Sequence, residues 1–393
     1  MRGGKWRDAH PATVRCQKID RVLSRGLPGP RHQNCRIPEP ELRFSLFFEG
    51  VSAIRDPNMA ATAATTGIPV GPPVQFPPST PSRPFLSVMI PASAETDHLL
   101  ETLESVLAQD LGPGIMQIEV IDNSSAEGLG ETLAERFRDR VSYFRHALRV
   151  SATRSWNTCL ERARGEWTHI LLANDVVRPD FYTTLRRTLE ANPGVEAFAC
   201  RCALTDDEGF WLGLSEPQAK VAGCLPAEFP IRQIVRHRLN LSSLVIRRDF
   251  FEQFGGFQER LRYCADWDLC NRLALKRQIF YDPHFLVSVR EHEGEGRFLY
   301  IPSGENVAEA RECLRIYAAL FPGNRRRTIY SDGMTYAALD ALRRCRHYRA
   351  DGKAKGARRQ LLEAGICMLG IARSYAMMPL RRFAIRETST VGR

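Results

Sequence analysis

Several features that identify common classes of protein are missing from this chain of 393 residues. The first 30 residues contain no apolar run like that of a secretory signal peptide. The longest uncharged apolar run near the C-terminus, 364–372, is too short to span a bilayer. The 11 cysteines include no CxxC pair, so neither a zinc site nor a regular disulfide framework is expected. These absences favour a protein of a reducing compartment, such as the cytoplasm, that is soluble or peripheral on a membrane.

Glycine-rich phosphate loops are also missing. Neither GxGxxG nor GxxxxGK[ST] occurs anywhere in the chain, which excludes the usual dinucleotide and P-loop sites. A nucleotide-binding sheet without such a loop has to hold a diphosphate differently, typically with a divalent metal ion and carboxylates.

Positive charge is concentrated at the two ends of the chain. The formal net charge is +10, with +5 in residues 1–58, −6 in residues 59–324 and +11 in residues 325–393. An acidic body makes a nucleic-acid partner unexpected. Near the C-terminus, Lys and Arg bracket the apolar stretch 361–380. That pattern is typical either of a solvated helix face or of a helix that lies on an anionic membrane surface.

Composition divides the chain into three parts. Residues 1–84 read as a disordered basic leader followed, from residue 60, by a Pro-rich linker without a core face, with Met59 as the expected physiological start. Residues 85–324 alternate β-rich runs with amphipathic helices, and residues 325–393 form a basic helical extension. The alternation predicts an α/β fold with a doubly wound, mainly parallel, Rossmann-like sheet. Its expected strands are 86–90, 118–121, 141–144 and 168–172, and its expected helices are 99–107, 129–137, 156–163 and 181–189.

Polar residues follow three of the expected strands. Ligands bind beyond the carboxyl ends of strands in such sheets, so Pro91, Asp122 and the pair Asn174-Asp175 are candidates. Asp122 could accept a hydrogen bond from a base or ribose, or it could cap the following helix through an Asx turn. Asn174 and Asp175 could coordinate Mg²⁺ or Mn²⁺, or they could cap a helix.

Two further candidates lie later in the chain. Asp266 and Asp268 fall in the first turn of an expected helix, where they complement the helix dipole; at i and i+2 their side chains diverge, so one can face a cleft while the other is structural. His292 is a lone loop histidine, either on the surface or available to a metal ion or phosphate.

The order of these segments resembles the family 2 nucleotide-sugar glycosyltransferases, over about residues 85–300. FLSVMIP resembles the opening strand of the family, ETLESVLAQ its next helix, and IEVIDNSS its second strand with the Asp that follows it. WNTCLERARGEWTHILLANDVVRPDF resembles the segment that contains the DxD motif and continues to a Pro-Asp pair. FFEQFGGFQERLRYCADWDLCNRLAL resembles the segment with the catalytic acid, and VREH the terminal R-x-H.

The resemblance implies a GT-A fold and assigns roles by position. Asp266 matches the catalytic base, although Ala265 replaces the usual preceding Glu. The nucleotide-sugar site would include Pro91, Ala92, Asp122, Arg154, Asn157 and Asn174. The metal site would include Asn174, Asp175 and His292, with Leu172 and Asn174 in place of both DxD carboxylates.

The implied activity is inverting transfer of a hexose-like sugar from a nucleoside diphosphate sugar to an acceptor hydroxyl. The implied acceptor is a glycan or a lipid-linked saccharide in cell-envelope or extracellular polysaccharide or glycolipid synthesis, reached from the cytoplasmic face of the membrane. The degraded DxD motif supports an alternative, a GT-A-fold nucleotide-binding or scaffold protein with weakened catalysis.

Overall fold

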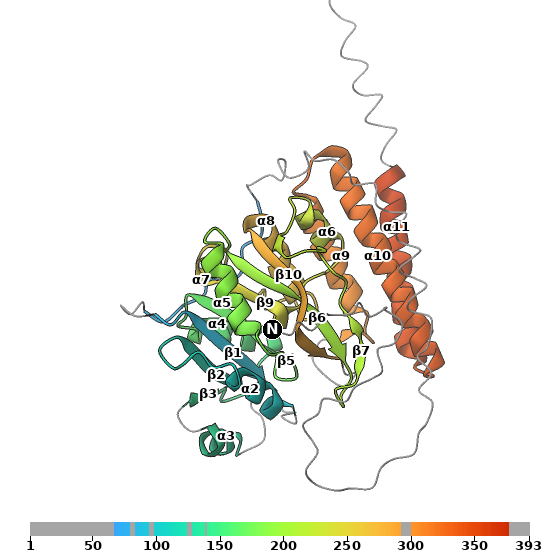
Figure 1. Cartoon of the computed structure of the whole chain (residues 1–393). Helices are drawn as coiled ribbons and strands as arrows, with labels where there is room; N and C mark the ends of the chain where they lie inside the picture. Colours follow the sequence, from blue (N-terminus) through green and yellow to red (C-terminus); the bar gives the residue numbers. More distant parts are fainter. Residues whose placement is uncertain are drawn as a thin grey trace, which may run out of the picture. The chain divides into compact units, whose positions relative to one another are not determined.

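The computed structural model describes residues 67–78, 83–93, 98–123, 128–137, 140–291 and 300–376. All of them belong to one compact unit, Pro57–Arg393 (Figure 1). The described strands are β1 (Leu86–Ala92), β2 (Met116–Asp122), β3 (Ser142–Arg145), β4 (Trp167–Ile170), β5 (Val176–Val177), β6 (Ala197–Thr205), β7 (Trp211–Leu214), β8 (Gly223–Cys224), β9 (Leu244–Arg247) and β10 (Ile279–Arg290). The described helices are α2 (Leu99–Leu107), α3 (Leu129–Phe137), α4 (Ala152–Arg162), α5 (Phe181–Ala191), α6 (Phe229–Val235), the 3₁₀ helix η4 (Leu241–Ser243), α7 (Arg248–Phe254), α8 (Ala265–Lys276), α9 (Glu305–Ala318), α10 (Gly323–Ala350) and α11 (Ala354–Ala376).

Strands β3, β2, β1 and β4 form the parallel half of the sheet. β1 pairs in parallel with β2 on one side and with β4 on the other. Every residue of β2 is buried, as expected for a parallel strand covered on both faces. The predicted doubly wound α/β sheet is therefore confirmed.

The other half of the sheet is mixed. The strand order is β3-β2-β1-β4-β9-β6-β10-β5, and β9 runs antiparallel to both of its neighbours, β4 and β6. β10 is parallel to β6, and the register of this pair shifts at bulges between Asp282 and Val287 of β10. The antiparallel β9 thus joins the two parallel parts of the sheet.

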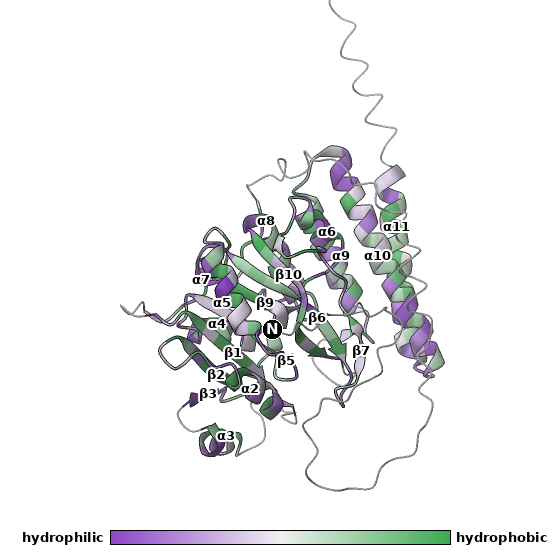
Figure 2. Ribbon diagram, viewed as in Figure 1, coloured by the Kyte–Doolittle hydropathy of each residue, from purple (hydrophilic) through white to green (hydrophobic). Residues whose placement is uncertain are grey.

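Helices cover the sheet with their apolar faces. Val88 and Ile90 of β1 share one core with Leu99 and Leu103 of α2 and with α5, whereas α4 packs on β1, β2 and β4. Figure 2 shows the apolar strands beneath helices whose outer faces are hydrophilic. Because β1, β2 and β4 are parallel and adjacent, their carboxyl ends open at one edge of the sheet.

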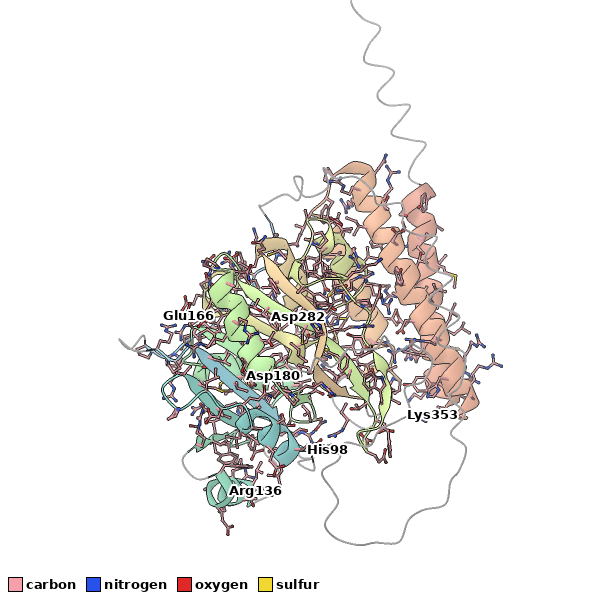
Figure 3. The ribbon with its side chains drawn as sticks, viewed as in Figure 1. His98, Arg136, Glu166, Asp180, Asp282 and Lys353 are labelled. Atoms are coloured by element: carbon pink, nitrogen blue, oxygen red, sulfur yellow. The ribbon has the colours of Figure 1, made fainter. Side chains whose placement is uncertain are left out.

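The C-terminal helices α10 and α11 form an antiparallel hairpin. They contact each other along their length and pack on α9. Lys353 lies in the turn that connects the two helices (Figure 3). Gly333 allows the close approach of α10 to α9, because a Cβ at this position would lie 2.1 Å from Cδ2 of Leu314. The predicted helices at 335–349 and 357–375 are thus present, and the first begins earlier than predicted.

Part of the Pro-rich segment contacts the sheet domain, which the sequence did not predict. The backbone N–H of Gly71 donates to the carbonyl of Phe254 at 2.8 Å, and that of Gly256 donates to the carbonyl of Pro72 at 2.9 Å. The guanidinium of Arg248 lies 4.1 Å from the ring centroid of Phe76. Extended Pro-rich chain exposes its carbonyls, and here the loop after α7 binds those of Val70 and Pro72.

Candidate functional site

The residues predicted at the ends of β1 and β2 lie side by side. Pro91 is in register with Ile121, and Ala92 with Asp122. The backbone N–H of Asn123 donates to the carbonyl of Ala92 at 2.9 Å, so pairing continues to the edge of the sheet.

The carboxylate of Asp122 is fully buried and held by β3. The hydroxyl of Tyr143 donates to its Oδ2 at 2.6 Å, and Nε of Arg145 lies 3.5 Å from the same oxygen. Burial, and then the hydrogen bond to Asp122, raise the pKa of Tyr143 well above its usual value. Tyr143 therefore stays protonated and acts as the donor, which fixes the orientation of the carboxylate.

Asn157 and Arg154 of α4 are tied to the loop that follows α7. Asn157 accepts from the backbone N–H of Phe257 at 2.8 Å and donates to its carbonyl at 3.0 Å. Arg154 makes a bidentate ion pair with Glu161, at 2.7 and 2.9 Å, and lies 3.6 Å from Glu259. Asn157 therefore fixes this loop to α4, whereas the main partner of Arg154 lies within α4 itself.

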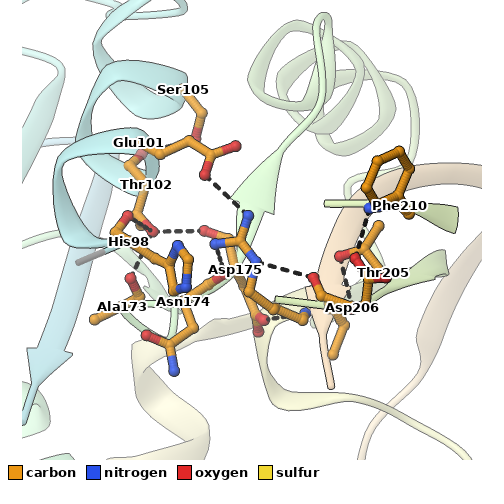
Figure 4. A network of polar contacts seen from close by, with 12 residues as sticks. His98, Glu101, Thr102, Ser105, Ala173, Asn174, Asp175, Thr205, Asp206 and Phe210 are labelled. Carbon is orange, nitrogen blue, oxygen red and sulfur yellow. Dashed lines mark hydrogen bonds and ion pairs between the residues drawn. The ribbon is translucent and has the colours of Figure 1, made fainter. Parts of the chain in front are cut away.

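Asp175 lies at the centre of a polar network beyond β4 (Figure 4). Its Oδ1 accepts from the backbone N–H of Arg290 at 3.0 Å, and its Oδ2 accepts from the hydroxyl of Ser242. The guanidinium of Arg290 donates to Glu101 at 2.9 Å and to the carbonyl of Asn174 at 3.4 Å. This network joins α2, the end of β4, the segment before β9 and the end of β10.

The described part of the predicted metal site does not fit a divalent ion as it is arranged. Asp175 is only 2% exposed, and both of its carboxylate oxygens accept hydrogen bonds from protein groups. His292 lies outside the described residues. Among the residues that the structure does describe, no three His, Cys, Asp or Glu side chains are grouped so that they could hold a metal ion.

Asp266 occupies the first turn of α8, as predicted. Its Oδ1 accepts from the backbone N–H of Trp267 at 2.8 Å, and its Oδ2 lies 3.9 Å from Nδ1 of His237. The side chain of Asp266 is 13% exposed. It is therefore partly accessible, with Oδ2 directed to the segment between α6 and β9.

Asp268 diverges from Asp266 and is structural. Its Oδ2 accepts from Nε of Arg272 at 3.0 Å, and its Oδ1 accepts from the hydroxyl of Tyr317 at 2.7 Å. Arg272 is completely buried and also donates to the carbonyls of Phe254 and Gly256, both at 2.8 Å. The expected division between one accessible and one structural carboxylate is thus present.

Glu309 of α9 holds the loop that precedes α8. Its carboxylate accepts from the backbone N–H groups of Arg262, Tyr263 and Cys264, each at 2.8 Å. These groups precede the helix that carries Asp266. Glu309 therefore positions the start of α8.

The segment 237–242 connects the two halves of the site. His237 faces Asp266, and Ser242, five residues later, binds Asp175. Five residues span at most about 18 Å, so both acids border the same short segment. Sequence reasoning did not identify His237, Ser242 or Glu309, because nothing in their local pattern distinguishes them from loop or helix-surface residues.

Known proteins are similar to this chain over the part that contains most of the strands of the sheet. The model of the family described as "Glycosyl transferase family 2" matches residues 87–246. An uncharacterized protein of Mycobacterium tuberculosis is 27% identical over 54% of this chain and 68% of its own length. An uncharacterized glycosyltransferase of Rickettsia felis is 24% identical over 54% of this chain, but the match spans only 35% of that protein.

The fold also resembles that of solved structures. The crystal structure of S. aureus TarS 1-349 in complex with UDP-GlcNAc aligns with a TM-score of 0.50 and 14% identity, over 73% of this chain and 92% of that chain. At this identity the likeness concerns the fold, and it agrees with the GT-A fold that the sequence implied.

Proposed function

Because the model of glycosyl transferase family 2 matches residues 87–246, we propose that the chain is a glycosyltransferase that moves a sugar from a nucleoside diphosphate sugar to an acceptor hydroxyl with inversion. The observation that carries the proposal is the arrangement around segment 237–242. Asp175, beyond the end of β4, and the accessible carboxylate of Asp266 both border this segment, and β4 is the direct neighbour of β1, whose end would hold the nucleotide.

In the proposed reaction, Asp266 is the general base. Its Oδ1 is held by the backbone of Trp267, so Oδ2 is the oxygen that would accept the proton of the acceptor hydroxyl. The acceptor oxygen forms a bond to the anomeric carbon while the bond to the diphosphate oxygen breaks in line. The proton goes to Asp266 and the electron pair leaves with the nucleoside diphosphate. One base suffices, unlike the carboxylate pair of a glycoside hydrolase.

The donor side of the proposal rests on the parallel half of the sheet. Pro91, Ala92 and Asp122 would contact the nucleoside, with Arg154, Asn157 and Asn174 nearby. The family resemblance also implies a divalent ion, which the buried Asp175, with both carboxylate oxygens bonded to protein groups, does not fit as it is arranged. Donor binding should therefore be measured with Mn²⁺, with Mg²⁺ and with EDTA.

The variant Asp266→Asn tests the base assignment. We expect transfer to fall roughly 100- to 10,000-fold, the usual contribution of a general base, while nucleotide affinity changes by less than about twofold. Release of UDP or GDP from donor sugars and calorimetric binding of UDP and GDP measure the two quantities. Glu190→Gln, an exposed carboxyl change on α5, is the matched control.

Two results would contradict parts of this proposal. Near wild-type transfer by the Asp266→Asn variant would show that another group is the base. Tight nucleotide binding by the wild type without release from any donor sugar would favour the weakened scaffold protein.

The C-terminal hairpin supports a membrane-bound acceptor. Large apolar side chains of α11 are exposed, including Leu361 (53%), Leu362 (53%) and Leu369 (61%). Exposed Lys355, Arg358, Arg359 and Arg373 accompany them. Such a face suits an anionic lipid surface, where a lipid-linked saccharide would be presented. None of the helices described within residues 67–376 is long and apolar enough to cross a membrane.

The state of the cysteines supports a cytoplasmic site of action. Every cysteine within the described residues is a free thiol, and all of these except Cys224 are buried. Buried free thiols are usual in proteins of reducing compartments.

A further inference from the structure

The hairpin of β6 and β7 presents three consecutive apolar side chains to solvent. Phe210, Trp211 and Leu212 are 54%, 49% and 55% exposed. The backbone N–H of Phe210 donates to Oδ1 of Asp206 at 2.7 Å, and that of Asp206 donates to the carbonyl of Phe210 at 3.0 Å. A closed turn therefore holds these side chains in place, and large apolar groups exposed together commonly mark a contact surface.

The indole of Trp211 is supported from one side. Its ring packs edge-on against Phe285 of β10, with centroids 5.3 Å apart and an interplanar angle of 75°. The guanidinium of Arg178 lies 5.0 Å from the centroid of Phe285. About half of Trp211 remains exposed while Phe285 holds its ring in place. Because the ring is already held, less side-chain entropy is lost when a ligand stacks on it.

The hairpin is joined to the candidate site through Arg290. Nε of Arg290 donates to the carbonyl of Asp206 at 3.3 Å, while its backbone N–H donates to Asp175 at 3.0 Å. Figure 4 shows Asp206 and Phe210 beside Asp175 and Glu101 in one network. A group bound on the hairpin would therefore border the same edge of the sheet.

The acidic side chains around this surface indicate which kind of ligand it can bind. The turn that carries the aromatic residues contains Asp206, Asp207 and Glu208, and the last two are exposed. Carboxylates accept hydrogen bonds from hydroxyl groups and repel anionic lipid headgroups. The hairpin is thus unlike the basic α11, and it suits a neutral ligand with hydroxyls on its rim and an apolar C–H face. A sugar ring has this chemistry.

We propose that Trp211 forms a platform for a sugar ring of the acceptor, with Asp207 and Glu208 accepting hydrogen bonds from its hydroxyls. The inference rests on the proposed function and deepens it, because it requires the acceptor to present a saccharide beside the transferred sugar.

Trp211→Ala in the full chain tests the platform with two independent readouts. Ligand-observed saturation-transfer NMR measures binding of methyl glycosides of glucose, galactose, mannose and N-acetylglucosamine. Release of nucleoside diphosphate from UDP-glucose, UDP-GlcNAc and GDP-mannose without acceptor measures the donor site. Trp211→Phe keeps an aromatic face, and Tyr375→Ala removes a similarly exposed aromatic ring (54%, against 49% for Trp211) on α11 as the matched control.

The expected result is an affinity for at least one glycoside that falls about tenfold or more in Trp211→Ala, with donor hydrolysis unchanged. Trp211→Phe and Tyr375→Ala should bind like the wild type. Unchanged glycoside binding by Trp211→Ala would overturn the inference. So would a wild type that hydrolyses a donor but binds no glycoside, or a dimer that dissociates in Trp211→Ala. If the wild type releases no nucleotide from any donor, the proposed function fails, whereas glycoside binding still reports on the hairpin.

Discussion

His169 is a fully buried histidine of β4 whose ring contacts couple the core to the site. One ring nitrogen lies 3.2 Å from the hydroxyl of Tyr182 and the other 2.8 Å from the carbonyl of Ser242. Burial lowers its pKa from 6.5 to about 4. The unfolded chain therefore takes up more protons than the folded chain between these values. Stability from the neutral ring is complete above pH 6.5 and is lost as the pH falls from 6.5 to about 4.

The free energy of unfolding should accordingly drop by about 2 kcal/mol from this group alone between pH 7 and pH 5. Guanidinium unfolding at the two pH values measures the drop. A His169→Gln variant should be less stable at pH 7 and should show a smaller difference between the two pH values. An equal pH difference in this variant would assign the effect to other groups.

Single residues also mark the limit of what the sequence could predict. Asp266 and Asp268 were predicted in one helical turn with diverging roles, because helix geometry fixes their directions. The partners of Asp175 were not predictable, because Ser242 and Arg290 are brought to it by tertiary packing across 67 and 115 residues. The metal assignment of Asp175 depended on its position in a motif, which does not reveal hydrogen bonds that already use its oxygens.

Among the elements, α8 depends on α9 for its position. Three backbone N–H groups before α8 donate to the carboxylate of Glu309, and hydrogen bonds to a charged group are worth more than neutral ones. Glu309→Ala should destabilise the protein by roughly 1 to 2 kcal/mol and should lower transfer more than it lowers nucleotide binding, because it loosens the turn that carries Asp266. Chemical unfolding and donor turnover measure the two effects.

The same helix supplies the control. Glu312 is paired with the exposed Arg315, so Glu312→Ala should change stability by less than about 1 kcal/mol. Equal losses in the two variants would mean that Glu309 acts only through helix propensity or surface charge.

The elements themselves were largely predictable, since hydrophobic periodicity located the first four strands and their helices. The direction of β9 was not, because a short apolar run fits either orientation. The fold of segment 67–78 against α7 was also missed, since most of its binding groups are backbone N–H and carbonyl groups, which have no sequence signature.

For the whole molecule, the exposed face of α11 predicts binding to anionic vesicles. The full chain should bind phosphatidylglycerol-containing vesicles more tightly than pure phosphatidylcholine vesicles, and high salt should weaken this binding. Changing Leu361, Leu362 and Leu369 together to Ser should weaken vesicle binding about tenfold or more. Each of these leucines is more than half exposed, and the serine variant no longer has this apolar surface to bury in the membrane interface.

Co-sedimentation measures the bound fraction, and Leu148→Ser is the control, since Leu148 is 79% exposed far along the chain from α11. Binding that ignores the anionic lipid fraction, or that survives the triple change, would leave α11 as a solvated helix face.

The central place of β9 has a consequence for how the chain acquires its structure. β9 pairs with β4 through residues about 80 positions apart, Trp167 and Arg247, and it also borders β6. Neither β4 nor β6 can complete its hydrogen bonding until β9 is inserted between them. The two parts of the sheet are therefore expected to be acquired and lost together as one cooperative unit, with β9 closing the long loops between them.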